Sequence, residues 1–113
     1  MAAGARHHLA IVEGERPIGC IGIVPAGDAR GELGLWIGRD FHGRGFGTDA
    51  VRLATRYAFE RAALTTLEAA VFVGNFASRR VLEKNGFLLE RTQRRALPNG
   101  GRVVDEWLFG LSR

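Results

Sequence analysis

Cysteine and long apolar runs are scarce in this sequence, and each scarcity excludes a class of protein. The single cysteine among 113 residues, Cys20, has no partner for an internal disulfide or for a paired-cysteine metal site. No apolar stretch has the length of a signal peptide or a membrane span, and the opening segment leads into His7 and His8. We therefore expect a soluble protein of the reducing cytoplasm, with Cys20 as a small core residue.

Neither sign of charge dominates the sequence. Sixteen Lys and Arg residues against twelve Asp and Glu give a formal net charge of +4. This balance suits a surface that binds anionic ligands, but there is no polybasic tail and no indication of nucleic acid. Hydrophobic residues make up 46% of the chain, which is enough for one buried core. We expect a single domain over residues 1–113.

Short apolar runs and helical periodicity predict a mixed α+β sheet, opened by three antiparallel strands. The predicted strands are 9–12, 18–24, 32–37, 67–73, one from residue 87 and one at 102–111. The predicted helices are 46–61 and 76–84, and the predicted turns are 13–17, 25–31 and 97–101. The aromatic residues expected in the core are Trp36, Phe72, Phe87, Trp107 and Phe109.

A glycine-rich loop at 42–48 connects a predicted strand to the longer predicted helix. Glycines there let backbone N–H groups turn toward a ligand, and the helix N-terminus adds unpaired amides and partial positive charge. The loop therefore predicts a pyrophosphate site, to which Arg44 can add a direct charge contact. Its residues are His42, Gly43, Arg44, Gly45, Phe46, Gly47 and Thr48.

Two other interpretations of this loop are open at the level of the residues. A dinucleotide-binding loop fits poorly, because Thr48 occupies the place of the third glycine and the next strand ends at 71–73 without an acid. The closing antiparallel hairpin also disfavours that interpretation. The other alternative is a turn that binds no ligand.

Two motifs together resemble one acyltransferase family. Residues 42–47 fit the pattern Q/R-x-x-G-x-G/A, with His42 in the place of Gln or Arg. Residues 75–78 and 81–87 fit N-x-x-S followed by LEKxGF. The chain thus resembles the GNAT superfamily, in the branch that contains the ribosomal-protein N-terminal acetyltransferases of the RimJ/RimL type. The resemblance runs from the strand at 18–19 to the strand at 105–107.

The resemblance implies a sheet splayed between the strand of Glu32 and the strand at 67–73, into which the pantetheine arm of acetyl-CoA inserts. Ile37, the loop 42–48 and Asn75 would then contact the co-substrate, and Arg79 or Arg80 would reach its ribose 3′-phosphate. Alternatively, Asn75 only caps a helix and the arginines are solvated. The family's first strand and first two helices precede the segment seen here. We therefore expect an N-terminally shortened domain whose acceptor pocket is closed by another subunit, open, or degenerate.

The family also implies roles in catalysis. Glu32 matches a general base that acts through water, or it is an ordinary strand glutamate. Ser78 matches a serine near the thioester sulfur, or it bonds locally within its helix. Leu82 stands where many members have a tyrosine acid, and residues 95–97 lack the acid that this branch often has there. A weak base suits an α-amine, since a neutral amine at pH 7 costs about 1 kcal/mol for an α-amine and about 4.5 kcal/mol for lysine.

Three functions compete at this stage. The first is transfer of an acetyl group from acetyl-CoA to a primary amine, a protein N-terminus or a small molecule, without a metal. The second is a non-catalytic acyl-CoA-binding module, which the missing tyrosine and the shortened N-terminus favour. The third, an RNA-binding domain, depends on charge alone. We expect a homodimer, because a strand at 9–12 would otherwise be an open sheet edge.

Overall fold

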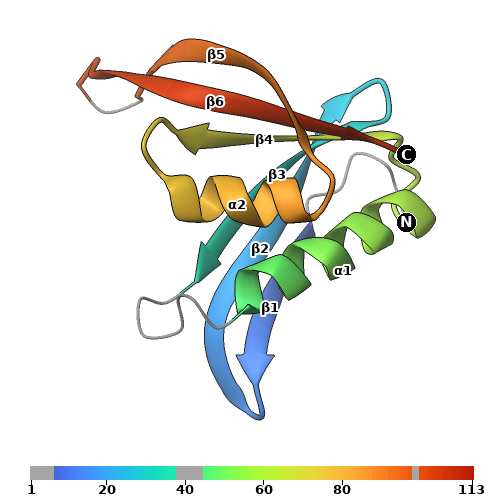
Figure 1. Ribbon diagram of the computed structural model, residues 1–113. Helices are drawn as coiled ribbons and strands as arrows, with labels where there is room; N and C mark the ends of the chain where they lie inside the picture. The colour runs from blue at the N-terminus through green and yellow to red at the C-terminus, as the bar shows by residue number, and fades with distance from the viewer. Residues whose placement is uncertain (1–6, 38–44, 98–99) are drawn as a thin grey trace.

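A computed structural model describes residues 7–37, 45–97 and 100–113. Six strands form one sheet, and two helices pack against it (Figure 1). In chain order the elements are β1 (His7–Glu13), β2 (Arg16–Gly27), β3 (Arg30–Ile37), α1 (Phe46–Glu60), β4 (Thr66–Phe72), α2 (Phe76–Lys84), β5 (Leu88–Ala96) and β6 (Val103–Ser112). All predicted elements are present, and the α+β class is confirmed.

The N-terminal meander is longer than the sequence predicts. β1, β2 and β3 pair antiparallel, as expected, but the predicted turn at 25–31 is wrong in extent. Pro25 pairs with Gly31, and only Asp28 and Ala29 remain between the strands, with φ of 53° and 58°. A two-residue turn with positive φ at both positions follows the right-handed twist of the flanking strands, so the strands continue up to it.

The sheet order is β1-β2-β3-β4-β6-β5. β3 and β4 are the parallel pair and are connected through α1, while β4 with β6 and β5 with β6 pair antiparallel. The sheet is therefore mixed and mainly antiparallel, as predicted. β1 and β5 form its two edges.

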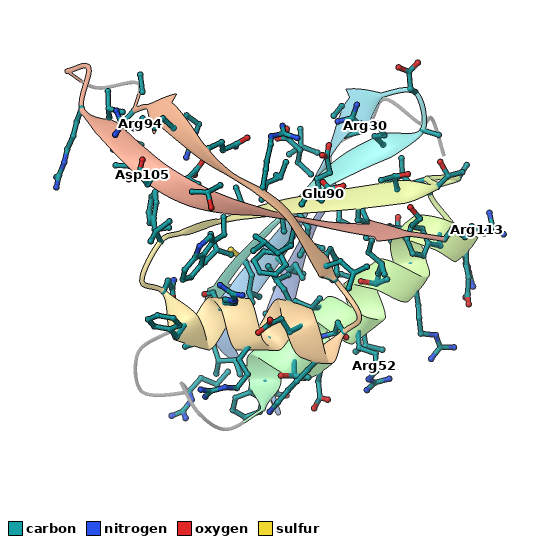
Figure 2. All side chains as sticks on the ribbon, turned by 45° about the horizontal axis from the view of Figure 1, so that its top comes forward. Arg30, Arg52, Glu90, Arg94, Asp105 and Arg113 are labelled. Carbon is teal, nitrogen blue, oxygen red and sulfur yellow. The ribbon has the colours of Figure 1, made fainter. Side chains whose placement is uncertain are left out.

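Both helices cover the same face of the sheet (Figure 1). In α1 the buried positions Ala50, Val51, Ala54 and Ala58 recur at helical spacing, and the small alanines allow close approach to the strands. The outer face of α1 carries Arg52, which is exposed (Figure 2). The core between sheet and helices consists of Ile21, Ile23, Leu33, Ala50, Val51, Ala54, Ala58, Ala62, Leu64, Leu67, Ala69, Val71, Leu82, Phe87 and Phe109.

Strand alternation places different side chains on the opposite face of the sheet. Cys20 is exposed there, so its predicted place in the core is wrong, because Ile21 rather than Cys20 points toward α1. Arg30 and Glu90 also lie on the side away from both helices, and Arg30 forms an ion pair with Glu68 (Figure 2). Neither helix of the described structure is long and apolar enough to cross a membrane.

Candidate functional site

The strands β3 and β4 separate shortly after they meet. Their parallel pairing covers only Arg30 with Thr66, Gly31 with Leu67 and Glu32 with Glu68. Beyond Glu32, β3 continues along β2 and β4 continues along β6, so the edges that face each other are not paired. Such facing edges offer backbone donors and acceptors to an extended polar chain inserted between them. This is the splay that the sequence resemblance implies.

A cavity of about 230 Å³ occupies the splay. Its walls come from β3, β4, α1, α2, β5 and β6, so residues far apart in the sequence converge on it. Most of the lining is apolar, and a few polar groups from α2, β5 and β6 are added at the wall. The lining residues are Leu33, Gly34, Leu35, Val51, Ala69, Ala70, Val71, Phe72, Asn75, Ser78, Val81, Leu82, Arg95 and Glu106.

The first turn of α2 brings Asn75 and Ser78 to the cavity. Asn75 is the N-cap of α2, and its Oδ1 accepts a hydrogen bond from the backbone N–H of Ser78 at 3.2 Å. The cap satisfies an amide that would otherwise lack a helical partner, and it fixes the backbone that carries the Ser78 hydroxyl. Two of the predicted site residues are thereby brought together.

The end of α2 is tied to the start of α1. The Asn85 Nδ2 donates to the backbone oxygen of Thr48 at 3.1 Å and to that of Val81 at 2.9 Å. Gly47 lies close to Val81 and Leu35, since a Cβ built on it would be 3.4 Å and 3.5 Å from their methyl groups. These contacts hold the glycine-bearing first turn of α1 against the cavity wall.

The N-terminus of α1 has the geometry of an anion cradle. Gly45 is its N-cap in the left-handed conformation, with φ of 83°, and as a glycine it has no side chain to cap the helix. The first intrahelical bond runs from the Asp49 N–H to the Gly45 oxygen at 3.1 Å. A Cβ on Gly45 would meet no atom of the described residues within 4 Å. The glycine and the helix end together fit a pyrophosphate group.

The other predicted site residues either do not line the cavity or lie outside the described residues. His42, Gly43 and Arg44 lie outside the described residues, and only the backbone of Ile37 is described. Phe46 and Thr48 are half-buried in the first turn of α1, whereas Arg80 is exposed on α2. Glu32 is exposed on β3 and does not line the cavity.

Arg79 has a structural task that the sequence did not indicate. Its guanidinium carbon lies 4.6 Å from the centroid of the Trp107 ring and 5.7 Å from that of Phe109. Its Nε also pairs with the Glu83 carboxylate at 3.5 Å. Arg79 thus packs α2 onto β6 through cation–π contacts, which leaves Arg80 as the better candidate for a phosphate.

Sequence reasoning missed Glu106, the most deeply buried acid of the site. Its side chain is 3% exposed, and Arg95 donates to it from Nε at 3.0 Å and from Nη2 at 2.8 Å. These hydrogen bonds hold the pKa of Glu106 below its ordinary value, although burial acts in the opposite direction. The sequence does contain a pattern that could have indicated Glu106. Val104, Glu106 and Leu108 alternate along the strand, so the Glu106 carboxylate lies on the same face as two apolar side chains and, once buried there, requires a hydrogen-bond partner.

Phe72 was also misplaced by the sequence prediction. It was expected in the core, but it is 50% exposed and lines the cavity. It is the last residue of β4, and the alternation along the strand directs its side chain to the face opposite the buried Val71. Phe87 and Phe109 are buried as predicted, and Trp107 packs against the core.

Comparisons with known proteins agree with this geometry. Residues 1–88 match the family model described as "Acetyltransferase (GNAT) domain". YdaF of Bacillus subtilis (strain 168), whose name describes a ribosomal N-acetyltransferase, is 41% identical over 82 residues, which cover 73% of this chain and 45% of YdaF. The N-acetyltransferase p20 of Bacillus licheniformis is 30% identical over 108 residues, which cover 94% of this chain and 61% of p20.

A solved structure extends the likeness to three dimensions. The structure of Mycobacterium smegmatis RimJ in complex with CoA-disulfide superposes with a TM-score of 0.88 at 26% identity, over 96% of this chain and 54% of RimJ. The chain therefore spans about half the length of relatives such as YdaF and RimJ. On the family match and this shared fold, the chain belongs to the GNAT acetyltransferase family.

Proposed function

We propose that this chain carries the transfer site of an acetyl-CoA-dependent N-acetyltransferase that acetylates a primary amine, either a protein N-terminal α-amine or the amine of a small molecule. The observation that carries the proposal is the cavity between β3 and β4, which brings the Ser78 hydroxyl to unpaired strand edges. Acetyl-CoA would supply an acetyl thioester to that cavity. The names of YdaF and p20, which describe N-acetyltransferases, support the reaction class.

Two parts of the structure fit two parts of acetyl-CoA, its pyrophosphate and its pantetheine arm. The left-handed Gly45 and the first turn of α1 offer positively polarised backbone N–H groups for the pyrophosphate. The separated edges of β3 and β4 offer backbone groups for the amides of the pantetheine arm. Asn75 can donate from its amide nitrogen while its oxygen caps α2.

The chemistry requires one bond to form and one to break. The acceptor nitrogen forms a bond to the thioester carbonyl carbon, the carbon–sulfur bond breaks, the amine loses a proton and the sulfur gains one. A hydroxyl at Ser78 can donate a hydrogen bond to the sulfur as negative charge develops there. We assign the removal of the amine proton to Glu32, acting through a water molecule. The hydrogen bond to Glu106 raises the pKa of Arg95 at the cavity wall, and the negative charge of Glu32 also raises it.

An acceptor screen tests the proposal. Release of free thiol from acetyl-CoA is followed with a tripeptide amide, a peptide bearing only a lysine amine, spermidine and an amino sugar, and the products are identified by mass spectrometry. We expect thiol release that depends on an added amine and a matching acetylated product. Calorimetric binding of acetyl-CoA without release to any amine would contradict transfer and support the acyl-CoA-binding module.

A further inference from the structure

The wall of the cavity contains a fixed ion pair between β5 and β6. Glu106 is the one buried charged residue among those the structure describes, with 2% of its surface exposed. Arg95 binds both of its carboxylate oxygens, and the Gln93 Nε2 donates to Oε1 at 3.4 Å. A two-point contact of this kind fixes the plane of the guanidinium and not only its position.

The arginine of this pair retains donors for a ligand. The two bonds to Glu106 use the Nε–H and one N–H of Nη2. Within residues 7–37, 45–97 and 100–113, no oxygen accepts a hydrogen bond from Nη1. The Arg95 side chain is 49% exposed and lines the same cavity as Ser78. A preoriented set of N–H donors therefore lies at the wall of the cavity that Ser78 also lines.

We propose that Arg95, held by Glu106, is a specificity residue that binds a carbonyl oxygen adjacent to the acceptor amine. The acceptor class is then a peptide or amino-acid amide with a free α-amine, in preference to a polyamine or a simple alkylamine. The inference depends on the proposed function, because it assigns an acceptor to that same site.

The chemistry of the acceptors gives the reason for this preference. A peptide N-terminus has a carbonyl oxygen one carbon away from the amine, which a guanidinium N–H can bind. A polyamine offers no such oxygen, so the guanidinium N–H of Arg95 is left without an acceptor when a polyamine binds. A site built to hydrogen-bond an acceptor discriminates strongly against analogues that lack the bonding group, since its own polar group is then left unpaired.

The neighbouring Arg94 provides a matched control. It directly precedes Arg95 on β5, but its side chain points to the other face, is 80% exposed and pairs with Asp105 at 3.3 Å. Figure 2 shows Arg94 and Asp105 together near the hairpin end of β5 and β6. Neither residue lines the cavity. Removing the charge at 94 thus changes the same net charge by the same amount without touching the site.

The test is the ratio of kcat/KM for alanyl-alanyl-alanine amide to that for propylamine, measured with saturating acetyl-CoA. We expect Arg95→Gln to lower this ratio by about tenfold or more, because one charge-assisted hydrogen bond is lost for one acceptor only. Glu106→Gln, which removes the anchor of the guanidinium, should lower the ratio less. Arg94→Gln should leave the ratio as in the wild type.

A second variant and a binding measurement separate failure of this inference from failure of the proposed function. If Arg95→Gln does not fold, as judged by circular dichroism, Arg95→Lys retains a cation beside Glu106 but loses the planar fork, and the ratio should still fall. A ratio unchanged in a folded Arg95 variant would overturn the specificity role and leave the transferase intact. Failure of the wild type to acetylate any amine while it binds acetyl-CoA in calorimetry would overturn the proposed function, and this inference with it.

Discussion

The Oδ1 of Asn75 accepts a hydrogen bond from the backbone N–H of Ser78 at 3.2 Å, and both residues line the cavity between β3 and β4. The contact makes one residue serve the helix and the site at once. By capping α2, Asn75 fixes the backbone from which the Ser78 hydroxyl points. The local hydrogen bond uses the backbone of Ser78, so its hydroxyl remains available for chemistry.

Ser78→Ala should lower kcat for acetyl transfer by about tenfold or more, because a donor that acts as charge develops on sulfur stabilises mainly the transition state. The dissociation constant of acetyl-CoA should change by less than about twofold. Steady-state kinetics and calorimetry on the same preparation separate the two effects. An equal loss in both quantities would reduce Ser78 to a binding residue.

Gly45→Asp should weaken acetyl-CoA binding by about tenfold or more, because it places a carboxylate beside the proposed pyrophosphate cradle. The backbone at residue 45 has φ of 83°, so any side chain adds strain there. Gly45→Asn is the matched control, because asparagine tolerates this conformation, has the same shape and lacks the charge. Calorimetry that gives the same affinity for the Asp and Asn variants would place the pyrophosphate elsewhere.

The ion pair of Arg95 with Glu106 should give a pH-dependent contribution to stability. The hydrogen bonds from Arg95 lower the folded-state pKa of Glu106 below the ordinary value of 4.5, at which the unfolded chain titrates. The contribution is therefore complete above about pH 4.5 and is lost as the pH falls through the lowered folded-state pKa.

Urea unfolding from pH 7 to pH 3 measures this contribution. The difference in free energy of unfolding between the wild type and Glu106→Gln should shrink as the pH falls below 4.5. Asp105→Asn is the control, since its partner Arg94 is 80% exposed and a solvated pair contributes little. A difference for Glu106→Gln that is constant across this range would contradict an ionised, hydrogen-bonded carboxylate.

Gly31→Ala should destabilise the fold by roughly 1–3 kcal/mol, because Gly31 lies where β3 and β4 meet before they separate. A Cβ there would come within 2.7 Å of the Leu64 Cδ1, closer than side chains tolerate. A Cβ at Gly34 would meet no described atom within 4 Å. The free energy of unfolding of Gly34→Ala should therefore differ from that of the wild type by less than about 0.5 kcal/mol. Thermal or urea unfolding compares the two variants, and equal stability would show that the packing of Leu64 against Gly31 does not constrain this position.

We propose that the protein is a homodimer. β1 is an edge strand, and among the described elements only β2 pairs with it. Val12 on this strand is 54% exposed, and such an edge is a template for pairing. Sedimentation velocity at about 5–50 μM should give the mass of two chains, since symmetric pairs are the commonest assembly. A monomer across that range would refute the dimer.

The sequence predicted local structure well, because local patterns determine it. The helix at 76–84 agrees with α2, since Asn75 caps its start and Asn85-Gly86 follows its end. The turn predicted at 25–31 is shorter in the structure, and its extent was missed because neither Asp28 nor Ala29 is a glycine and their positive φ follows from the pairing of β2 with β3.

The contacts of the site were harder to predict because they depend on strand register. Gln93 pairs with Glu106 across β5 and β6, which brings Arg95 to the same carboxylate. A bulge between Leu89 and Arg91 shifts that register by one residue, and no local pattern announces it. The acidic residue of the cavity thus comes from β6, whereas the family pattern directed attention to residues 95–97 at the end of β5.

A crystal structure of the chain with bound CoA tests the proposed site most directly. We expect the pantetheine arm to lie between β3 and β4, with its sulfur within about 4 Å of the Ser78 Oγ, and the pyrophosphate to contact the first turn of α1 at Gly45. CoA bound on another surface, with the cavity between β3 and β4 free of it, would refute this site.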